Sequence, residues 1–246
     1  MRISSRVYLL ASGHLGCSFS HPNDCNVYAV RCGSRYFLID TGVGLNTDRI
    51  LSELESDKIQ PAQVEGILLT HGHLDHSGGA ALLHEALGAP VFSSRQTADA
   101  MERADEQAIS LAAAKSAGIY GPEVRLTACP VERVLEDHGC FDAGDSRITP
   151  IHTPGHSHDM LSYLVESPDG RLLFPGDTVF HGGKILLSAT WDCDPQAYAV
   201  SLRSLSQLTI EGLYPGHGLW SVNDSSRHLE QSLRFVNQLL LPPNLM

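Results

Sequence analysis

Three histidines and an aspartate lie within six residues in the first half of the chain. Residues 68–79 read LLTHGHLDHSGG, so the cluster follows an apolar run and precedes two glycines. Imidazole and carboxylate groups are ligands of zinc and other borderline divalent metals. In an extended segment His71, His73 and Asp75 can share one side, and a turn into a helix can bring His76 beside Asp75. This loop offers more ligands than one tetrahedral zinc would take, so we expect a two-metal site completed from later in the chain.

Three later loops share one pattern, in which an apolar segment ends, a glycine follows and a side chain that can bind a metal comes next. The three side chains are His156, Asp177 and His217. Glycine lets the backbone approach a crowded site, and the proline before each glycine stiffens the loop. One histidine after a glycine is more often a turn residue than a ligand. Three such loops together with the histidine cluster favour ligands.

The seven positions resemble the full signature of the metallo-β-lactamase-fold hydrolase superfamily: His71-x-His73-x-Asp75-His76, then His156, Asp177 and His217. The resemblance extends from about Tyr8 to His217. It implies an α+β fold, an αββα sandwich of two mixed β-sheets flanked by helices, with the metals at one edge. It also implies that Asp40, at the end of an early strand, supports the metal loop; the alternative is a turn-former before Thr41 and Gly42.

The same resemblance implies a role for each ligand. One metal would be held by His71, His73 and His156. The second would be held by Asp75, His76 and His217, and Asp177 would bridge the two together with a water or hydroxide. The expected cofactors are two divalent ions, most often Zn²⁺, although iron and manganese occupy similar sites in some members.

Such a centre is suited to hydrolysis. Two divalent ions, two carboxylates and a hydroxide leave a charge of roughly +1, which favours an oxyanion developing on a carbonyl. A metal also lowers the pKa of bound water to about 7. We therefore expect a metal-bound hydroxide to open a small-molecule ester, thioester or lactone, as in glyoxalase II-like thioesterases and homoserine lactonases. Asp177 and Asp75 are the expected catalytic carboxylates, and Asp75 can orient the nucleophile or shuttle its proton.

Other function classes remain as alternatives. Phosphodiester hydrolysis is the first, because related nucleases share the histidine motif; the net charge of −11 and the lack of a basic cluster argue against nucleic acid as a partner. A diiron redox protein is less favoured, since a glutamate would be expected at the position of His73. A binding protein that kept only the fold would usually have lost some ligands.

Five further residues are candidates for contact with substrate. Phe180, His181 and Lys184 follow Asp177 closely, and glyoxalase II-like thioesterases have a basic residue in the corresponding loop. The aromatic side chains of Tyr120 and Trp191 are the other two candidates, although loop aromatics more often serve packing.

The remaining pattern predicts the elements that position these residues. Ile67–Thr70 is expected to be a buried strand that leads into the histidine loop, and Ser77-Gly78-Gly79 to let the following helix pass beneath the ions. Gln96–Ser116 is rich in alanine and predicts one long helix; the region of about 96–121 is either an outer helix or a cap over a cleft. No Pro/Gly/Ser-rich linker divides residues 1–246, so we expect one domain.

Cysteine usage and hydropathy bear on the compartment. The six cysteines form no CxxC pair, there is no secretory h-region, and no stretch of 18 consecutive apolar residues exists. We expect a cytoplasmic protein with a small-molecule substrate and no nucleic-acid or membrane partner. A homodimer is among the oligomeric states left open.

Overall fold

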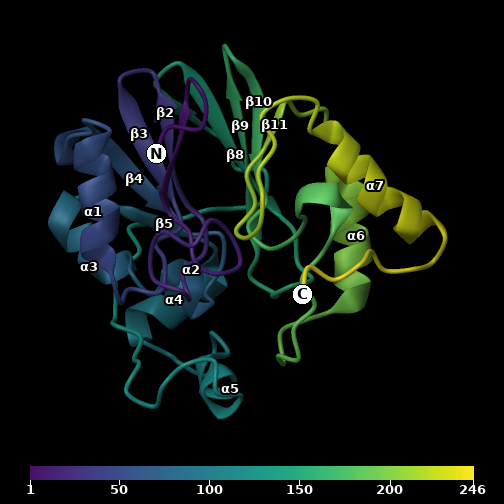
Figure 1. Cartoon of the computed structure of the whole chain (residues 1–246), viewed down its shortest axis with the longest axis horizontal. Coiled ribbons are helices and arrows are strands. Elements are labelled where there is room, and N and C mark those ends of the chain that lie inside the picture. The colour runs from purple at the N-terminus through teal and green to yellow at the C-terminus, as the bar shows by residue number, and fades with distance from the viewer.

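Two β-sheets lie face to face in the computed structural model, which describes residues 1–246, and helices cover their outer faces (Figure 1). The first sheet has the strand order β1-β2-β3-β4-β5-β6: Val7–Ala11, Val27–Cys32, Arg35–Ile39, Val64–Leu68, Val91–Ser93 and Arg133–Val134. The second has the order β11-β10-β9-β8-β7: Gly212–Leu213, Gly170–Phe174, Leu161–Ser167, Ser146–His152 and Phe141–Ala143. Both sheets mix parallel and antiparallel pairs. The predicted αββα sandwich is confirmed.

The helices flank these sheets on opposite sides. The α-helices are α1 (Thr47–Ser56), α2 (Leu74–Ser77), α3 (Ala80–Leu87), α4 (Arg95–Arg103), α5 (Leu111–Ser116), α6 (Pro195–Leu205) and α7 (Ser226–Asn237). Two short 3₁₀ segments are η1 (Pro61–Gln63) and η2 (His181–Gly183). Figure 1 shows α1 and α3 beside the first sheet and α6 and α7 beside the second. No helix is long and apolar enough to cross a membrane.

Three apolar layers hold the sandwich together, and the alternation of side chains along the strands fills them. In β10, Leu172 and Phe174 point between the two sheets, whereas Leu173 packs under α6 and α7. In β1, Val7 and Leu9 enter the layer between the sheets. The third layer joins the first sheet to α1 and α3. β1 is buried on both of its faces, and this explains why its sequence is continuously apolar.

The topology brings the ends of five strands to one edge. β3 and β4 are parallel, and β8 and β10 both run antiparallel to β9, with β11 parallel to β10. The carboxyl ends of these strands lead to the functional side chains: Asp40 after β3, His71 after β4, His156 after β8, Asp177 after β10 and His217 after β11.

The prediction of one helix over Gln96–Ser116 is wrong. The structure has α4 and α5, separated by turns at residues 104–110. Ala104 and Ser110 adopt left-handed φ angles of 49° and 59°. The Asp105 side chain accepts hydrogen bonds from the backbone N–H groups of Gln107 and Ala108, and this local turn competes with the helical ladder. Alanine content alone did not reveal the interruption.

Candidate metal centre

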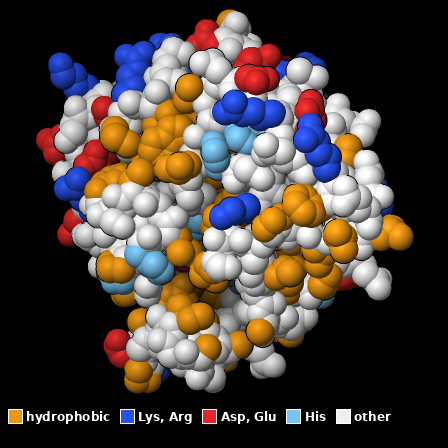
Figure 2. Space-filling model, turned by 45° about the vertical axis from the view of Figure 1, so that its right-hand side comes forward, with side chains coloured by type: hydrophobic (Ala, Val, Ile, Leu, Met, Phe, Trp, Pro, Cys, Tyr) orange, Lys and Arg blue, Asp and Glu red, His pale blue; other side chains and the backbone are white.

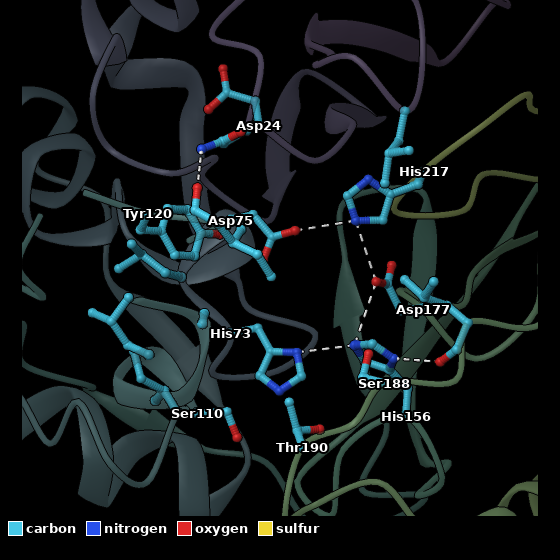
Figure 3. Close-up of a pocket in the computed structure, with 18 of the residues that line it drawn as sticks. Asp24, His73, Asp75, Ser110, Tyr120, His156, Asp177, Ser188, Thr190 and His217 are labelled. Carbon is cyan, nitrogen blue, oxygen red and sulfur yellow. Dashed lines mark hydrogen bonds and ion pairs between the residues drawn. The ribbon is translucent and has the colours of Figure 1, made fainter. Parts of the chain in front are cut away.

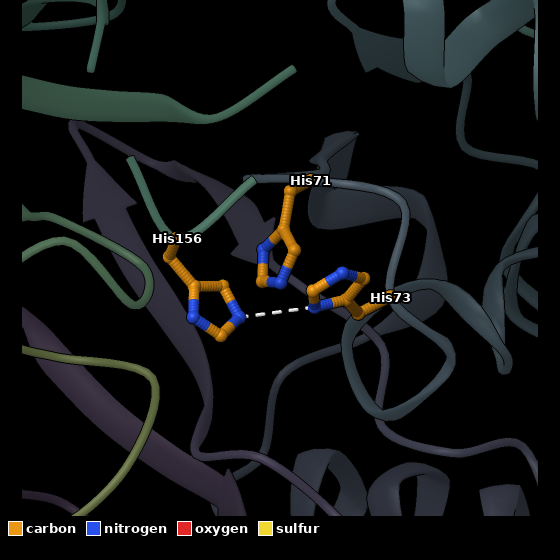
Figure 4. A group of neighbouring side chains, drawn as sticks. All are labelled: His71, His73 and His156. Atoms are coloured by element: carbon orange, nitrogen blue, oxygen red, sulfur yellow. Dashed lines mark hydrogen bonds between the residues drawn. The ribbon is translucent and has the colours of Figure 1, made fainter. Parts of the chain in front are cut away.

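Three imidazole rings converge where the two sheets meet. His71 and His73 come from the loop after β4 and His156 from the loop after β8, and each offers a ring nitrogen within 4.8 Å of the others (Figure 4). The closest approach is 3.0 Å, between Nδ1 of His73 and Nε2 of His156. His71 is fully buried. These are the three side chains that the resemblance assigned to the first metal.

A second group lies beside the first. Asp75, His76 and His217 also offer ligand atoms within 4.8 Å of one another. Nε2 of His217 lies 3.2 Å from Asp75 Oδ2 and 3.3 Å from Asp177 Oδ2 (Figure 3). Asp177 also reaches the first group, since its Oδ2 lies 3.6 Å from Nε2 of His156. Asp177 is therefore the carboxylate placed between the two groups.

The donor set fits divalent ions. Donor atoms at about 2.0–2.1 Å from a tetrahedral zinc lie roughly 3.3–3.4 Å from one another. The separations in this centre cluster around that value, including 3.5 Å between His76 Nε2 and Asp177 Oδ1. Three buried atoms of the two candidate ligand groups and Asp177 have no hydrogen-bond partner: His71 Nε2, His76 Nε2 and Asp177 Oδ1. Unpaired buried polar atoms are costly, and cations bound by the two groups would satisfy all three.

Hydrogen bonds on the far side of the rings fix which nitrogen faces the centre. Nδ1 of His156 lies 2.8 Å from the backbone oxygen of Leu186, and Nδ1 of His76 lies 2.8 Å from Asp40 Oδ2. Nδ1 of His71 lies 3.0 Å from Thr70 Oγ1, which donates to Asp40 Oδ2. Each ring thus leaves Nε2 as the free acceptor.

Asp40 has both of the roles that the sequence suggested as alternatives, namely forming a turn and supporting the metal loop. It sits at a left-handed φ of 62° where β3 ends, so it does form a turn. Its carboxylate also accepts from the backbone N–H and the hydroxyl of Thr70, at 2.7 and 2.9 Å, and faces the His76 ring. The carboxylate thereby connects the metal loop to the first sheet.

His73 is oriented the other way. Its Nδ1 faces the centre, and its Nε2 lies 3.0 Å from Oδ2 of Asp192. Asp192 is only 3% exposed and lies in the loop before α6. Asp192 is not among the residues predicted from the sequence, because its partner is 119 positions away and no local pattern marks an acid of this kind.

The protonation states follow from burial and from charge. Burial lowers the pKa of His71 and brings that of His156 to about 4, so both rings are neutral. Burial alone would raise the pKa of Asp177, but the nearby His217 and His76 outweigh it and hold the value well below the usual range. Burial would likewise lower the pKa of His217, yet Asp177 and Asp75 raise it to about 9. A bound ion would replace that proton.

The glycines after His76 have a different role from the one expected. A Cβ on Gly78 would lie 2.3 Å from the backbone oxygen of Val43, and a Cβ on Gly79 would lie 2.3 Å from that of Thr41. Their crowding comes from the loop after β3 and not from the ion site. The two glycines therefore let α2 and α3 pack against that loop.

A cavity of about 270 Å³ opens onto the centre. His73, Asp75, His156, Asp177 and His217 form its polar floor. Four segments of the chain form its walls. The wall residues include Leu15, Asn23, Ile109, Ser110, Leu111, Tyr120, Leu186, Thr190 and Met246. No lysine or arginine lines the cavity. Figure 2 shows one face of the molecule, on which apolar and histidine side chains lie around a hollow.

Only one of the five predicted substrate-contact residues lines this cavity, namely Tyr120. Phe180 is fully buried, and its ring centre lies 6.4 Å from that of His217, so it packs behind a candidate ligand. His181 lies against His228, with ring centres 4.3 Å apart, and neither it nor Lys184 lines the cavity. Trp191 stays outside, because its indole N–H is held by the backbone oxygen of Gln107.

The wall residues gave little signal in the sequence. Ile109 and Ser110 fall in a stretch that reads as helix interior, and their cavity-facing position depends on the break between α4 and α5. Met246 reaches the cavity because the preceding residues pair with the chain before α6: the backbone N–H of Leu245 donates to the oxygen of Ile185 at 2.8 Å. Both placements depend on contacts between distant segments.

Comparison with known proteins agrees with this fold. A family model described as the metallo-beta-lactamase superfamily matches residues 22–217. Among solved structures, a metallo-beta-lactamase from Cronobacter sakazakii superposes with a TM-score of 0.73 at 18% identity, covering 97% of this chain and 96% of that one. The subclass B3 enzyme BJP-1 of Bradyrhizobium japonicum gives 0.70 at 18% identity, covering 97% and 89%. At these identities the likeness shows the fold.

Curated relatives include thioesterases. The chain is 27% identical to the atrochrysone carboxyl ACP thioesterase of Aspergillus fumigatus over 88% of this chain and 58% of that protein. It is 28% identical to the human acyl-coenzyme A thioesterase MBLAC2, over 68% of this chain and 62% of that protein. A probable metallo-hydrolase of Methanocaldococcus jannaschii is 26% identical over 76% and 84%. The chain thus spans less than two thirds of the length of the two thioesterases.

Proposed function

The chain belongs to the metallo-beta-lactamase superfamily, and from this premise we propose that it is a metal-dependent hydrolase of small-molecule thioesters. Esters and lactones, which share an activated acyl carbon, are the nearest other substrates. The proposal includes two divalent ions, most often zinc in such sites, held by the two groups of side chains with Asp177 between them. Its strongest support is the convergence of His71 Nε2, His76 Nε2 and Asp177 Oδ1, which are buried together without partners.

Ions in this centre would supply a hydroxide nucleophile at neutral pH and Lewis acidity toward the acyl carbonyl. The protein's own groups supply the positioning. Asp75 lines the cavity and is more exposed than Asp177, and its Oδ2 is held 3.2 Å from the His217 ring. The neighbouring His76 and His217 lower the pKa of its carboxyl group to about 2 against the effect of burial, so the group is ionised and can orient an attacking water by accepting its hydrogen bond. Orienting the nucleophile is the catalytic role we give to Asp75.

The cavity favours an uncharged acyl group. Apolar side chains such as Ile109, Leu111 and Tyr120 form the wall that faces the floor of metal-binding groups. An acyl chain gains by leaving water for such a wall, by about 25 cal/mol for each Å² of apolar surface buried. The names of the curated relatives, an acyl carrier protein thioesterase and an acyl-coenzyme A thioesterase, support the same substrate class.

Phosphodiester hydrolysis is the second candidate. The histidine motif alone permits it, but a phosphodiester carries a negative charge and no lysine or arginine lines the cavity. The protein's net charge of −11 also disfavours a nucleic-acid strand as the substrate, because binding its many backbone phosphates requires a basic surface. A redox role is the third candidate, and it requires iron.

A substrate panel on the zinc-loaded protein separates these functions. The panel contains acyl-coenzyme A thioesters of increasing acyl length, p-nitrophenyl esters, acyl homoserine lactones and bis-p-nitrophenyl phosphate. We expect thiol release from thioesters to show the highest kcat/KM, with a loss of activity on chelation and recovery on addition of zinc. Metal analysis gives the number and identity of the ions retained.

Two results would contradict the proposal. Turnover confined to the phosphodiester would assign the protein to the second class. Retention of iron alone, with oxygen consumption and no hydrolysis, would assign it to the third.

A further inference from the structure

The loop before α6 contains a carboxylate that contacts two functional parts of the molecule at once. Oδ2 of Asp192 lies 3.0 Å from Nε2 of His73, and Oδ1 accepts a hydrogen bond of 2.9 Å from Ser110 Oγ. Both Asp192 and Ser110 are buried, at 3% and 4% exposure. His73 belongs to the candidate metal centre, whereas Ser110 belongs to the cavity wall.

The wall in question is residues 105–121, which we call the wall segment. It contributes Ile109, Ser110, Leu111, Ala114, Ile119 and Tyr120 to the cavity. Side chains from both sides hold it: Trp191 donates to the backbone oxygen of Gln107 at 3.3 Å, and Asn23 donates to that of Ile119 at 3.3 Å. The wall segment therefore bridges the two sides of the cavity opening.

The wall segment also packs directly against the metal loop. A Cβ on Gly72 would lie 2.8 Å from Cγ2 of Ile109, so only a glycine between His71 and His73 leaves room for this contact. Ser110 itself adopts a left-handed φ of 59°, a conformation that the Asp192 hydrogen bond helps to hold. Two independent contacts, one through Ile109 and one through Ser110, thus link the wall to the loop that bears His71 and His73.

We propose that Asp192 is a positioning residue that aligns His73 for the metal and fixes the wall segment that contacts the acyl group. The proposal rests on the proposed function for the ions and the substrate, and on the structure for the contacts of Asp192 with His73 and Ser110. By accepting from Nε2–H of His73, the carboxylate leaves Nδ1 as the free nitrogen that faces the centre. By accepting a hydrogen bond from the Ser110 hydroxyl, the carboxylate sets the distance of Ile109 and Leu111 from the metal-binding floor of the cavity.

Metal affinity tests the first half without any need for turnover. Zinc binding is measured by competition with a chromophoric chelator for wild type, Asp192→Ala and Asp192→Asn. We expect Asp192→Ala to weaken one of two bound ions by about 10–100-fold, the range found when a partner of a metal-binding histidine is removed. Asp192→Asn should recover part of this affinity, because the amide oxygen still accepts from His73.

Asp194→Ala is the matched control. Asp194 lies two positions away and caps α6 through the backbone N–H groups of Gln196 and Ala197, with no contact to His73. Its loss should lower the melting temperature by about 2–4 °C and leave zinc affinity unchanged. Wild-type affinity in Asp192→Ala, or an equal loss of zinc in Asp194→Ala, would overturn the assignment.

Ser110→Ala tests the second half. The hydroxyl touches no reacting group, so both ions should be retained at wild-type affinity. Release of the wall segment should raise KM for long acyl thioesters by roughly 2–10-fold, with kcat nearly unchanged. An unchanged KM across acyl lengths would overturn the wall role. An inert protein in which Asp192→Ala still loses zinc would instead contradict the proposed hydrolase function alone.

Discussion

At the scale of single residues, the candidate metal centre is defined by hydrogen bonds behind the ligands as much as by the ligands. His71, His76 and His156 each direct Nδ1 to an oxygen, and His73 directs Nε2 to Asp192. A histidine whose far nitrogen is fixed loses less freedom when its near nitrogen binds an ion. These hydrogen bonds therefore set the orientation of each ring toward the centre.

Asp177→Ala should remove metal binding at both groups, since this carboxylate lies within 3.6 Å of His76, His156 and His217. The loss of zinc affinity should exceed the about 10–100-fold cost of removing a supporting residue, and hydrolysis should fall with it. Metal analysis measures the loss of zinc, and thioester kinetics measure the loss of hydrolysis. His158→Ala is the control, because its ring packs against Trp191, with ring centres 5.4 Å apart. Full activity in Asp177→Ala would contradict the ligand assignment.

Asp40→Asn should weaken zinc binding by about 10–100-fold while the protein stays folded. Asparagine tolerates the left-handed φ of 62°, but it cannot accept simultaneously through two carboxylate oxygens from Thr70 and His76. Zinc competition measures the loss of metal affinity, and circular dichroism shows whether the variant is folded. An unfolded variant would show that Asp40 serves the fold of the β3 turn more than the centre.

At the scale of elements, close backbone approach decides where the metal loop lies. α2 and α3 start against the loop after β3, and the backbone N–H and hydroxyl of Thr41 both donate to the oxygen of His76, at 2.8 and 2.7 Å. This contact leaves no space for a side chain at Gly79. The position of His76 therefore depends on a glycine three residues later.

Gly79→Ala should destabilise the protein by about 1–3 kcal/mol, because the added methyl group collides with the backbone oxygen of Thr41. The displaced loop should also bind zinc more weakly. Gly88→Asn is the control: Gly88 ends α3 at a left-handed φ of 62° with open space around it, and asparagine accepts that conformation. Urea unfolding of both variants gives the comparison, and equal stabilities would contradict the steric argument.

At the scale of the whole molecule, a buried arginine joins the two sheets away from the metal edge. Arg6, just before β1, contacts Asp145 between β7 and β8 and Asp169 between β9 and β10, each at 2.9 Å. Hydrogen bonding from Arg6 lowers the pKa of Asp145 to about 2. The second sheet is thereby held to the first by charge as well as by the apolar layer between them.

Arg6→Met should lower the free energy of unfolding by about 1–2 kcal/mol at neutral pH without changing zinc content. Because the folded pKa of Asp145 is below its ordinary value of 3.8, the contribution is full above that value and is lost as the pH falls toward about 2. The difference between variant and wild type should therefore shrink in acid. Arg147→Met, at an exposed pair with Asp142, should show no measurable change.

Removal of the ions should lower the stability of the whole sandwich, because the ligands come from both sheets. The loss approaches about 4 kcal/mol for each ion that had been present at 1,000 times its Kd. Thermal unfolding with and without a chelator measures it, and added zinc should restore the original melting temperature. A melting temperature insensitive to chelation would mean that the centre holds no ion in the folded state.

The sequence by itself determined the fold class and the seven candidate ligand positions that the structure brings together. Residues 71–76 form a short spacing pattern, and His156, Asp177 and His217 each follow a strand and a glycine, so local chemistry was enough to single out these positions. The apolar run at Ile67–Thr70 likewise predicted the strand that leads into the histidine loop, which the structure has as β4 at Val64–Leu68. These features depend on residues close together in the chain.

Only the tertiary structure decided what surrounds the ligands. Asp192 contacts His73, which lies 119 positions away in the sequence. Ile109 packs against Gly72 only because the chain breaks the predicted long helix into α4 and α5. Lys184, which was expected to contact substrate, lies outside the cavity. Such contacts are set by how the two sheets and their loops pack, and packing between distant segments leaves no periodic or compositional trace in the sequence. The metal-binding chemistry is therefore local in the chain, whereas the wall that would select a substrate is not.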